Sequence, residues 1–81
     1  MKISLVVKND KNTQLLKNFG MRIKELRDDK GMSQEDLADA ANIFRTYLSR
    51  IESGSANPSI AVMVSLAMAL SVLPHELLIQ D

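Results

Sequence analysis

The sequence contains no cysteine and only one histidine, His75, among its 81 residues. The absence of cysteine excludes a disulfide framework and a thiolate metal site, and one histidine cannot build a histidine metal cluster. We therefore expect no metal and no other cofactor. The sequence also lacks a nucleophile, base and acid in a pattern typical of catalysis, so it indicates neither an enzyme nor a small-molecule ligand site.

Charge is absent over one long stretch, because no charged residue stands between Ser53 and Pro74. The apolar part of this stretch, Ile60 to Leu73, is about 14 residues long, short of the roughly 20 that span a bilayer. A buried helix is therefore the better interpretation. The apolar run after Met1 ends at Lys8 without the small-residue cleavage site of a signal peptide. We expect no membrane segment and a cytoplasmic location.

The formal net charge is zero, but the charges are unevenly distributed along the chain. Residues 1–30 carry eight Lys and Arg against four acids, whereas residues 31–81 carry two against six. The only basic residues in that second part are Arg45 and Arg50. Zero net charge is weak evidence against nucleic-acid binding. Composition alone favours two ordinary surface arginines, so any case for DNA depends on pattern.

The first third of the chain predicts an N-terminal arm followed by a long helix. The arm, residues 1–11, contains an alternating apolar and polar segment at residues 2–8, which is typical either of a short strand or of a frayed end. A cap at Asp10 or Asn12 precedes the helix, and Gly31 ends it. An amphipathic stripe at three-four-three spacing supports this helix, and its members are Leu16, Phe19, Ile23 and Leu26.

Two short helices joined by a tight turn follow. Ser33 and Asp36 form a capping-box pattern at the start of the first helix. Asn42 supplies a residue that tolerates left-handed geometry at its end. The second helix is expected from about Phe44 to Ser53.

The last third of the chain predicts two more helices. The fourth follows a cap at Ser59 and shows three-four-three spacing again, with an apolar stripe of Ile60, Met63, Ala67 and Leu70. Pro74 fits the first position of a short fifth helix. The sequence therefore predicts a compact all-α domain of five helices over residues 12–81.

Two short helices set among three others predict a helix-turn-helix at about residues 33–53. Its second helix can enter the major groove of DNA, which is about 12 Å wide, if one side is anchored and the other is polar. Leu48 and Ile51 supply the anchors. Arginine can bond both O6 and N7 of guanine, and threonine can contact thymine. We expect base contacts from four residues on the opposite side: Arg45, Thr46, Ser49 and Arg50.

Three segments of the chain together resemble the lambda-repressor-like (Xre-type) helix-turn-helix family. They are Gly31 to Ala38 (GMSQEDLA), Ala41 to Gly54 (ANIFRTYLSRIESG) and Asn57 to Ser59 (NPS). The resemblance covers about residues 15–80 and implies a DNA-binding fold. The triplet Arg45-Thr46-Tyr47 is similar, more narrowly, to the controller proteins of restriction–modification systems.

The resemblance implies roles for residues around the base-contacting face. Gln34 would bond a phosphate and brace Arg45. Tyr47 would reach a phosphate or a base at the edge of the groove. Asn57 would offer its backbone N–H to a phosphate.

The resemblance also implies an ion pair between Arg27 and Glu52 that fixes the angle of the base-contacting helix. Such a pair is weak evidence for stability in itself. Arg22 and Lys24 would add non-specific attraction to phosphates, which depends on salt.

The chain departs from the family pattern at helix starts and on one helix face. Phe44 and Leu73 stand where a capping Ser, Thr or Asp is common. The expected fourth helix has no charge on its outer side, which suggests a contact with the N-terminal arm or a second subunit. Its outer residues are Ala61, Val62, Ser65 and Met68.

Taken together, the sequence predicts a sequence-specific transcription regulator that binds a two-fold operator in double-stranded DNA as a homodimer. Apolar residues near the chain end predict the dimer surface, at Leu73, Leu77, Leu78 and Ile79. Two alternatives stay open. One is an antitoxin-type regulator that also binds a toxin protein. The other is a protein-interaction module without DNA binding, for which the neutral net charge is the best support.

Overall fold

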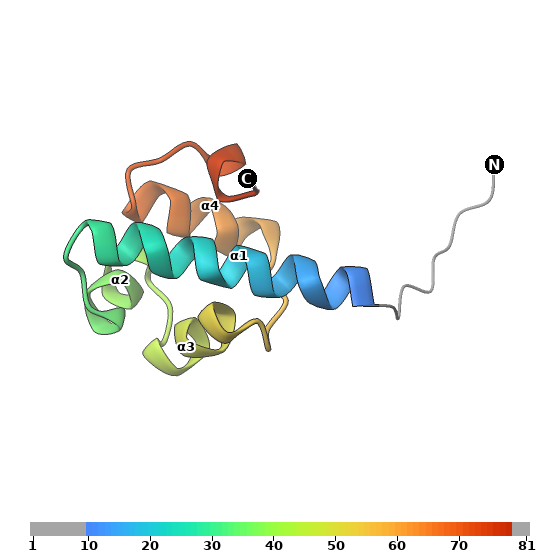
Figure 1. Cartoon of the computed structure of the whole chain (residues 1–81). Coiled ribbons are helices and arrows are strands. Elements are labelled where there is room, and N and C mark those ends of the chain that lie inside the picture. Colours follow the sequence, from blue (N-terminus) through green and yellow to red (C-terminus); the bar gives the residue numbers. More distant parts are fainter. Residues whose placement is uncertain (1–9, 79–81) are drawn as a thin grey trace.

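The computed structural model describes residues 10–78, which form four α-helices and one short 3₁₀ helix (Figure 1). In chain order these are α1 (Asp10–Asp29), α2 (Gln34–Ala41), α3 (Arg45–Ser53), α4 (Ile60–Ala69) and η1 (Pro74–Leu78). The all-α prediction is confirmed, and the fifth element is a 3₁₀ helix rather than an α-helix. Residues 10–78 contain no strand. The arm or strand expected within residues 2–8 lies outside the described residues.

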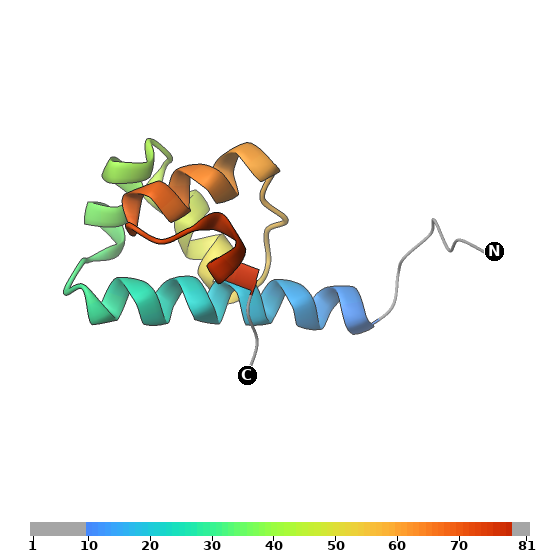
Figure 2. The same cartoon turned by 90° about the horizontal axis from the view of Figure 1, so that it is seen from above.

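The longest helix, α1, extends along one side of the molecule, and α2, α3 and α4 lie on the other side (Figure 2). It begins at Asp10, two residues before the predicted domain boundary at residue 12, and it ends two residues before Gly31. Gly31 adopts a φ of +68°, the left-handed geometry expected after a helix. The short η1 returns the chain to α1 and packs against it.

Buried apolar side chains from every element form one core between α1 and the other helices. The largest fully buried side chains are Ile23, Leu37, Leu48, Ile51, Leu66, Leu70 and Leu77. Burial of this apolar surface is the main favourable term in folding. The spacing on α1 predicted its buried side well, because Phe19 and Ile23 are buried and Leu26 packs partly against the core.

Three apolar predictions are wrong. Val62 was expected on the outer side of α4, but it is partly buried and packs against the core. Ile60 was expected in the buried stripe of α4, but it is 79% exposed because it begins the helix, beyond the end of the core. Leu77 was expected at a dimer surface, but it is only 1% exposed, because η1 packs against α1 and α4. Helical spacing identifies apolar positions, but it does not say how far the core extends along a helix.

The caps predicted for α2 and α4 are confirmed, whereas the cap predicted at Asp10 or Asn12 is wrong, because both residues lie within α1. The N–H of Asp36 donates to Ser33 Oγ at 3.0 Å and the N–H of Ser33 donates to Asp36 Oδ2 at 2.9 Å, so the capping box at α2 is confirmed. Asn42 ends α2 in left-handed geometry with a φ of 60°.

Phe44 precedes α3 as an N-cap without a side-chain hydrogen bond, as expected from its departure from the family pattern. Helix α3 therefore begins at Arg45, one residue after its predicted start.

Gly20 sets how closely α1 and α3 approach. A Cβ atom added there would lie 2.6 Å from the backbone oxygen of Glu52 and still closer to that of Ile51. Only glycine allows the backbones to come this near. This close approach explains a glycine inside a long helix, where it is otherwise unfavourable.

A membrane-spanning segment is not found in the part of the chain that the structure describes, since none of its helices is both long and apolar enough to cross a bilayer. The uncharged α4 has 10 residues, which agrees with the short apolar run in the sequence.

Candidate nucleic-acid interface

A tight turn holds α2 and α3 in the helix-turn-helix arrangement. The N–H of Ile43 donates to the backbone oxygen of Ala38 at 2.9 Å, which closes the end of α2. The backbone oxygen of Phe44 then accepts bonds from the N–H groups of Tyr47 and Leu48, at 3.1 and 3.0 Å. These local bonds fix where α3 begins relative to α2.

One side of α3 is anchored and the other faces solvent. Leu48 and Ile51 are fully buried. Among the four predicted base-contacting residues, Arg45, Thr46 and Arg50 are exposed and Ser49 is partly exposed. The helix therefore presents long, donor-rich side chains on a rigidly held backbone.

Arg50 also contacts the loop that follows α3. Its Nη2 donates to the backbone oxygen of Ser55 at 3.4 Å, which is long for such a bond. Because this contact is weak and exposed, it leaves Arg50 available to DNA. Arg45 has no comparable contact with the loop and lies at the opposite end of α3, where it meets Gln34.

A buried ion pair joins α3 to α1. Arg27 Nε donates to Glu52 Oε2 at 2.7 Å and Arg27 Nη2 donates to Glu52 Oε1 at 3.0 Å. The two residues are only 8% and 9% exposed. The bond from Glu52 raises the pKa of Arg27 although burial lowers it, so the guanidinium stays charged. Arg27 Nη1 also donates to the backbone oxygen of Met32 at 2.8 Å, which ties the start of α2 to the same centre.

Gln34 connects this buried pair to the exposed face. Its Nε2 donates to Glu52 Oε1 at 3.0 Å, so its Oε1 is turned away from the carboxylate. That oxygen accepts from Arg45 Nη1 at 3.5 Å, an exposed contact as long and weak as that of Arg50 with Ser55. The position of Arg45 is therefore linked through Gln34 to the ion pair in the interior.

An open groove of about 310 Å³ lies beside α3, with the ion pair among its lining residues. Besides Arg27 and Glu52, its lining residues are Lys24, Gln34, Ser49 and Ser53. Ser53 lines this groove but was not among the residues that the sequence predicted for the site. The signal was present, because Ser53 stands four residues after Ser49 and such positions share one side of a helix.

These features match a known family over most of the chain, since residues 23–77 correspond to the helix-turn-helix family. The chain belongs to this family. The resemblance to lambda-repressor-like helix-turn-helix proteins, first seen in short segments around Ser33 and Arg45, is thereby confirmed.

Several relatives in this helix-turn-helix family are regulators or control proteins. The chain is 41% identical to the control protein C.BamHI of Bacillus amyloliquefaciens over 68 residues, which cover 83% of this chain and 82% of that protein. It is 42% identical to the transcriptional regulator DdrOP3 of Deinococcus deserti over 57 residues, or 70% of this chain. The chain spans only 44% of the length of DdrOP3.

Solved structures of the same family have the same fold. The restriction–modification controller protein C.AhdI from Aeromonas hydrophila superposes with a TM-score of 0.76 and 44% identity, over 76% of this chain and 94% of that one. The controller protein C.Esp1396I, solved as a tetramer with its natural 35 base-pair operator, gives 0.72 and 40% identity. That match covers 78% of this chain and 83% of the controller.

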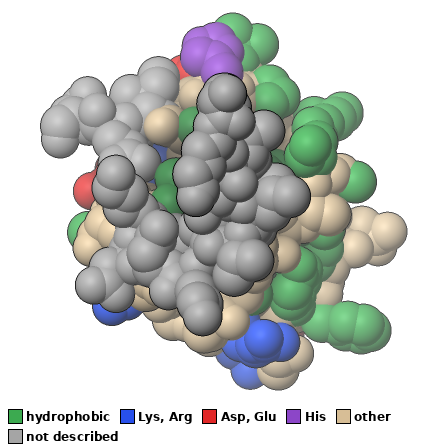
Figure 3. Space-filling model, turned by 90° about the vertical axis from the view of Figure 1, so that its right-hand side faces the viewer, with side chains coloured by type: hydrophobic (Ala, Val, Ile, Leu, Met, Phe, Trp, Pro, Cys, Tyr) green, Lys and Arg blue, Asp and Glu red, His purple; other side chains and the backbone are tan. Residues whose placement is uncertain are grey.

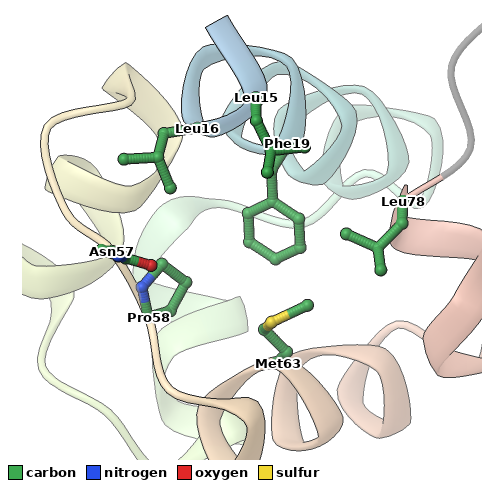
Figure 4. A pocket seen from close by; sticks show the side chains of 7 residues that line it. All are labelled: Leu15, Leu16, Phe19, Asn57, Pro58, Met63 and Leu78. Atoms are coloured by element: carbon green, nitrogen blue, oxygen red, sulfur yellow. The ribbon is translucent and has the colours of Figure 1, made fainter. Parts of the chain in front are cut away.

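Within this helix-turn-helix fold, three predicted phosphate-contacting residues have other surroundings. Arg22 Nε donates to the backbone oxygen of Glu76 at 3.3 Å, so Arg22 links α1 to η1. Tyr47 is half-buried and packs against the core. Asn57 lines a small apolar hollow between α1, the loop before α4 and η1 (Figure 4). None of the three lines the groove beside α3.

Among residues 10–78, no group of three or more His, Cys, Asp or Glu side chains is placed to hold a metal ion.

Proposed function

We propose that this chain is a sequence-specific transcription regulator that places α3 in the major groove of double-stranded DNA. One observation carries the proposal: α3 exposes Arg45, Thr46 and Arg50 while Leu48 and Ile51 fix it to the core. In this geometry the exposed side chains reach base edges, and the anchors keep the helix from rotating out of register.

A buried ion pair supports this role because it fixes the position of α3 on the rest of the domain. The pair of Arg27 and Glu52 holds α3 against α1, and Gln34 lies between that pair and Arg45. A helix whose position is fixed before binding leaves fewer groups to be ordered when its side chains meet base edges. Base contacts from Arg45 contribute to specificity and not only to attraction.

Phosphate attraction is expected to be modest. Arg27 is neutralised by Glu52, and Arg22 bonds η1, so Lys24 at the groove is the basic side chain best placed for the backbone. Few phosphate contacts give a shallow dependence of affinity on salt. This agrees with a chain whose formal net charge is zero.

We further propose that the chain binds a two-fold operator as a homodimer in the cytoplasm. Leu73 and Leu78 are 60% and 48% exposed at the end of the described chain. In the view of Figure 3, other exposed hydrophobic side chains lie along the right-hand side and Lys and Arg lie at the bottom, so the surface has separate apolar and basic parts. A dimer would place two α3 helices about 34–36 Å apart, one turn of DNA. The proposed dimer residue Ile79 lies outside the described residues.

Control of a restriction–modification system is the more specific candidate. The triplet Arg45-Thr46-Tyr47 opens α3, and the chain spans 82% and 94% of two relatives named as control proteins. It spans less than half of DdrOP3. A neighbouring gene for a restriction enzyme or methyltransferase would support this candidate, and a neighbouring toxin gene would favour an antitoxin-type regulator.

Selection of bound duplexes from random DNA tests the main proposal. The full chain should enrich an inverted repeat with half-sites one helical turn apart, and anisotropy titrations should show affinity falling as salt rises. Arg45→Ala should bind the enriched duplex more weakly than the wild type, and Lys30→Ala, at an exposed position just after α1, is its matched charge control. Failure to enrich any sequence, with no duplex binding at low salt, would refute the proposal and favour a protein-interaction module.

A further inference from the structure

Phe44 is the most exposed large hydrophobic residue in the described chain. It is 83% exposed at the N-cap position of α3, immediately before Arg45. It makes no side-chain hydrogen bond to the helix, so α3 lacks the stabilisation that a Ser, Thr or Asp cap supplies. Neither local helix stability nor core packing therefore explains a phenylalanine at this position.

We propose that Phe44 packs against the C5 methyl group of a thymine in the major groove, at the base pair next to the one that Arg45 contacts. This inference rests on the proposed function and assigns a further specificity-determining residue to the same surface. The thymine methyl is the apolar group that base pairs present in the major groove, and phenylalanine is a side chain that suits it.

The position of Phe44 in the helix-turn-helix favours such a contact. Residues at the N-terminus of the second helix are the ones that reach base edges. Consecutive Cα atoms are about 3.8 Å apart, and base pairs repeat about every 3.4 Å along the DNA axis. Phe44 and Arg45 therefore leave the backbone at points about one base-pair step apart, and we assign them to neighbouring base pairs.

The backbone at Phe44 is held in place although its ring is not covered. Its φ and ψ are −72° and 142°, and its backbone oxygen accepts two bonds from the first turn of α3. The ring thus projects from a fixed point on the interface. A position that breaks a local rule without a gain inside the fold is expected to serve function.

Phe44 is the only exposed large hydrophobic residue within residues 33–53, the helix-turn-helix segment. The other exposed large hydrophobics all lie outside residues 33–53, namely Leu15, Met21, Ile60, Val64, Met68, Leu73 and Leu78. A protein partner that docked on this surface would be expected to need a broad apolar patch. One ring beside Arg45 and Thr46 matches one methyl group among polar base edges.

Uracil scanning of the selected operator tests the inference, because uracil differs from thymine only by the missing methyl group. Each thymine of one half-site is replaced in turn, and binding of the full-length wild type and of Phe44→Ala is measured by anisotropy. We expect one uracil position to weaken wild-type binding about fourfold, the effect of one buried methyl group. At that position, Phe44→Ala should bind thymine and uracil equally.

The other thymines serve as internal controls, since their replacement should affect both proteins alike. Phe44→Leu keeps an apolar side chain and should retain part of the thymine preference, while unchanged melting temperatures would show that both variants fold. The inference is overturned if Phe44→Ala keeps the wild-type ratio of thymine to uracil affinity at every position. If the wild type binds no selected duplex, the proposed function itself fails.

Discussion

Arg27 donates two N–H···O bonds, of 2.7 and 3.0 Å, to the carboxylate of Glu52, and this contact joins α1 to α3. Two parallel bonds fix the angle between the groups as well as their separation. Glu52 also accepts from Gln34, so the same carboxylate supports both the helix axis and the side chain that meets Arg45.

Removal of the Glu52 charge is expected to destabilise the fold. Glu52→Gln leaves the Arg27 charge buried without its partner, so the free energy of unfolding should fall by about 3 kcal/mol. This is the lower end for buried pairs, because both residues line an open groove. Urea denaturation measures the loss.

Asp28→Asn is the control for this variant. Asp28 lies 3.4 Å from Arg27 but its side chain is 58% exposed, so the free energy of unfolding should fall by less than about 1 kcal/mol. Equal losses in both variants would contradict a special role for the buried pair.

Gly20→Ala should also destabilise the protein, although alanine is the better helix former. The added methyl would meet the backbone oxygens of Ile51 and Glu52, which belong to another helix and cannot rotate aside. We expect a loss of about 2 kcal/mol or more in thermal or urea unfolding. In an isolated peptide of residues 10–29, the same change should raise the helicity measured by circular dichroism, because alanine is about 1 kcal/mol more favourable than glycine inside a helix. A more stable full-length variant would contradict the close approach of α1 and α3.

Arg45→Ala should weaken binding to the selected operator by about 1–3 kcal/mol and relax the preference at one base position. Gln34→Ala should weaken binding less and leave the same preferred base, since Gln34 meets Arg45 only through a long contact of 3.5 Å. Competition with single-base variants of the operator separates the two effects. Unchanged selectivity of Arg45→Ala would remove Arg45 from the base-contacting residues.

Acid should weaken the capping box of α2. The bond from the backbone N–H of Ser33, with the Ser33 side chain second, holds the pKa of Asp36 below its ordinary value of 3.8. A group whose pKa is lowered by folding stabilises the native state above its unfolded pKa, and that contribution is lost as pH falls through the folded value. The stability difference between wild type and Asp36→Asn should therefore be constant above about pH 5 and vanish at lower pH. Identical pH profiles would contradict this assignment.

Substitutions at Leu77 and Leu78 should have different effects, one on folding and the other on dimerisation. Leu78→Glu, at a residue 48% exposed, should give a monomer of normal melting temperature in sedimentation. Leu77→Ala, at a fully buried position, should cost about 2–5 kcal/mol of stability instead. Met21→Glu, at an exposed position on α1, is the matched charge control and should leave the dimer intact. A wild type that stays monomeric at high micromolar concentration would refute the dimer.

The sequence by itself determined the helices and their order. Short-range rules were sufficient for this, because a cap or a C-terminal turn depends on residues three or four apart. The pairing of Ser33 with Asp36 and the left-handed Asn42 follow from such rules. The buried side of α3 at Leu48 and Ile51 also followed from helical spacing.

Only the tertiary structure decided which side chains meet across helices. The spacing could not distinguish buried Leu77 from exposed Leu78, because η1 is a 3₁₀ helix and its facing partner is α1. It gave no sign that Arg22 bonds η1. The geometry of the contact from Arg27 through Glu52 to Gln34 likewise depends on how near α1 comes to α3. That distance is set at Gly20, where the backbone of α1 approaches the backbone of α3. The pattern of side chains along one helix does not encode such an approach.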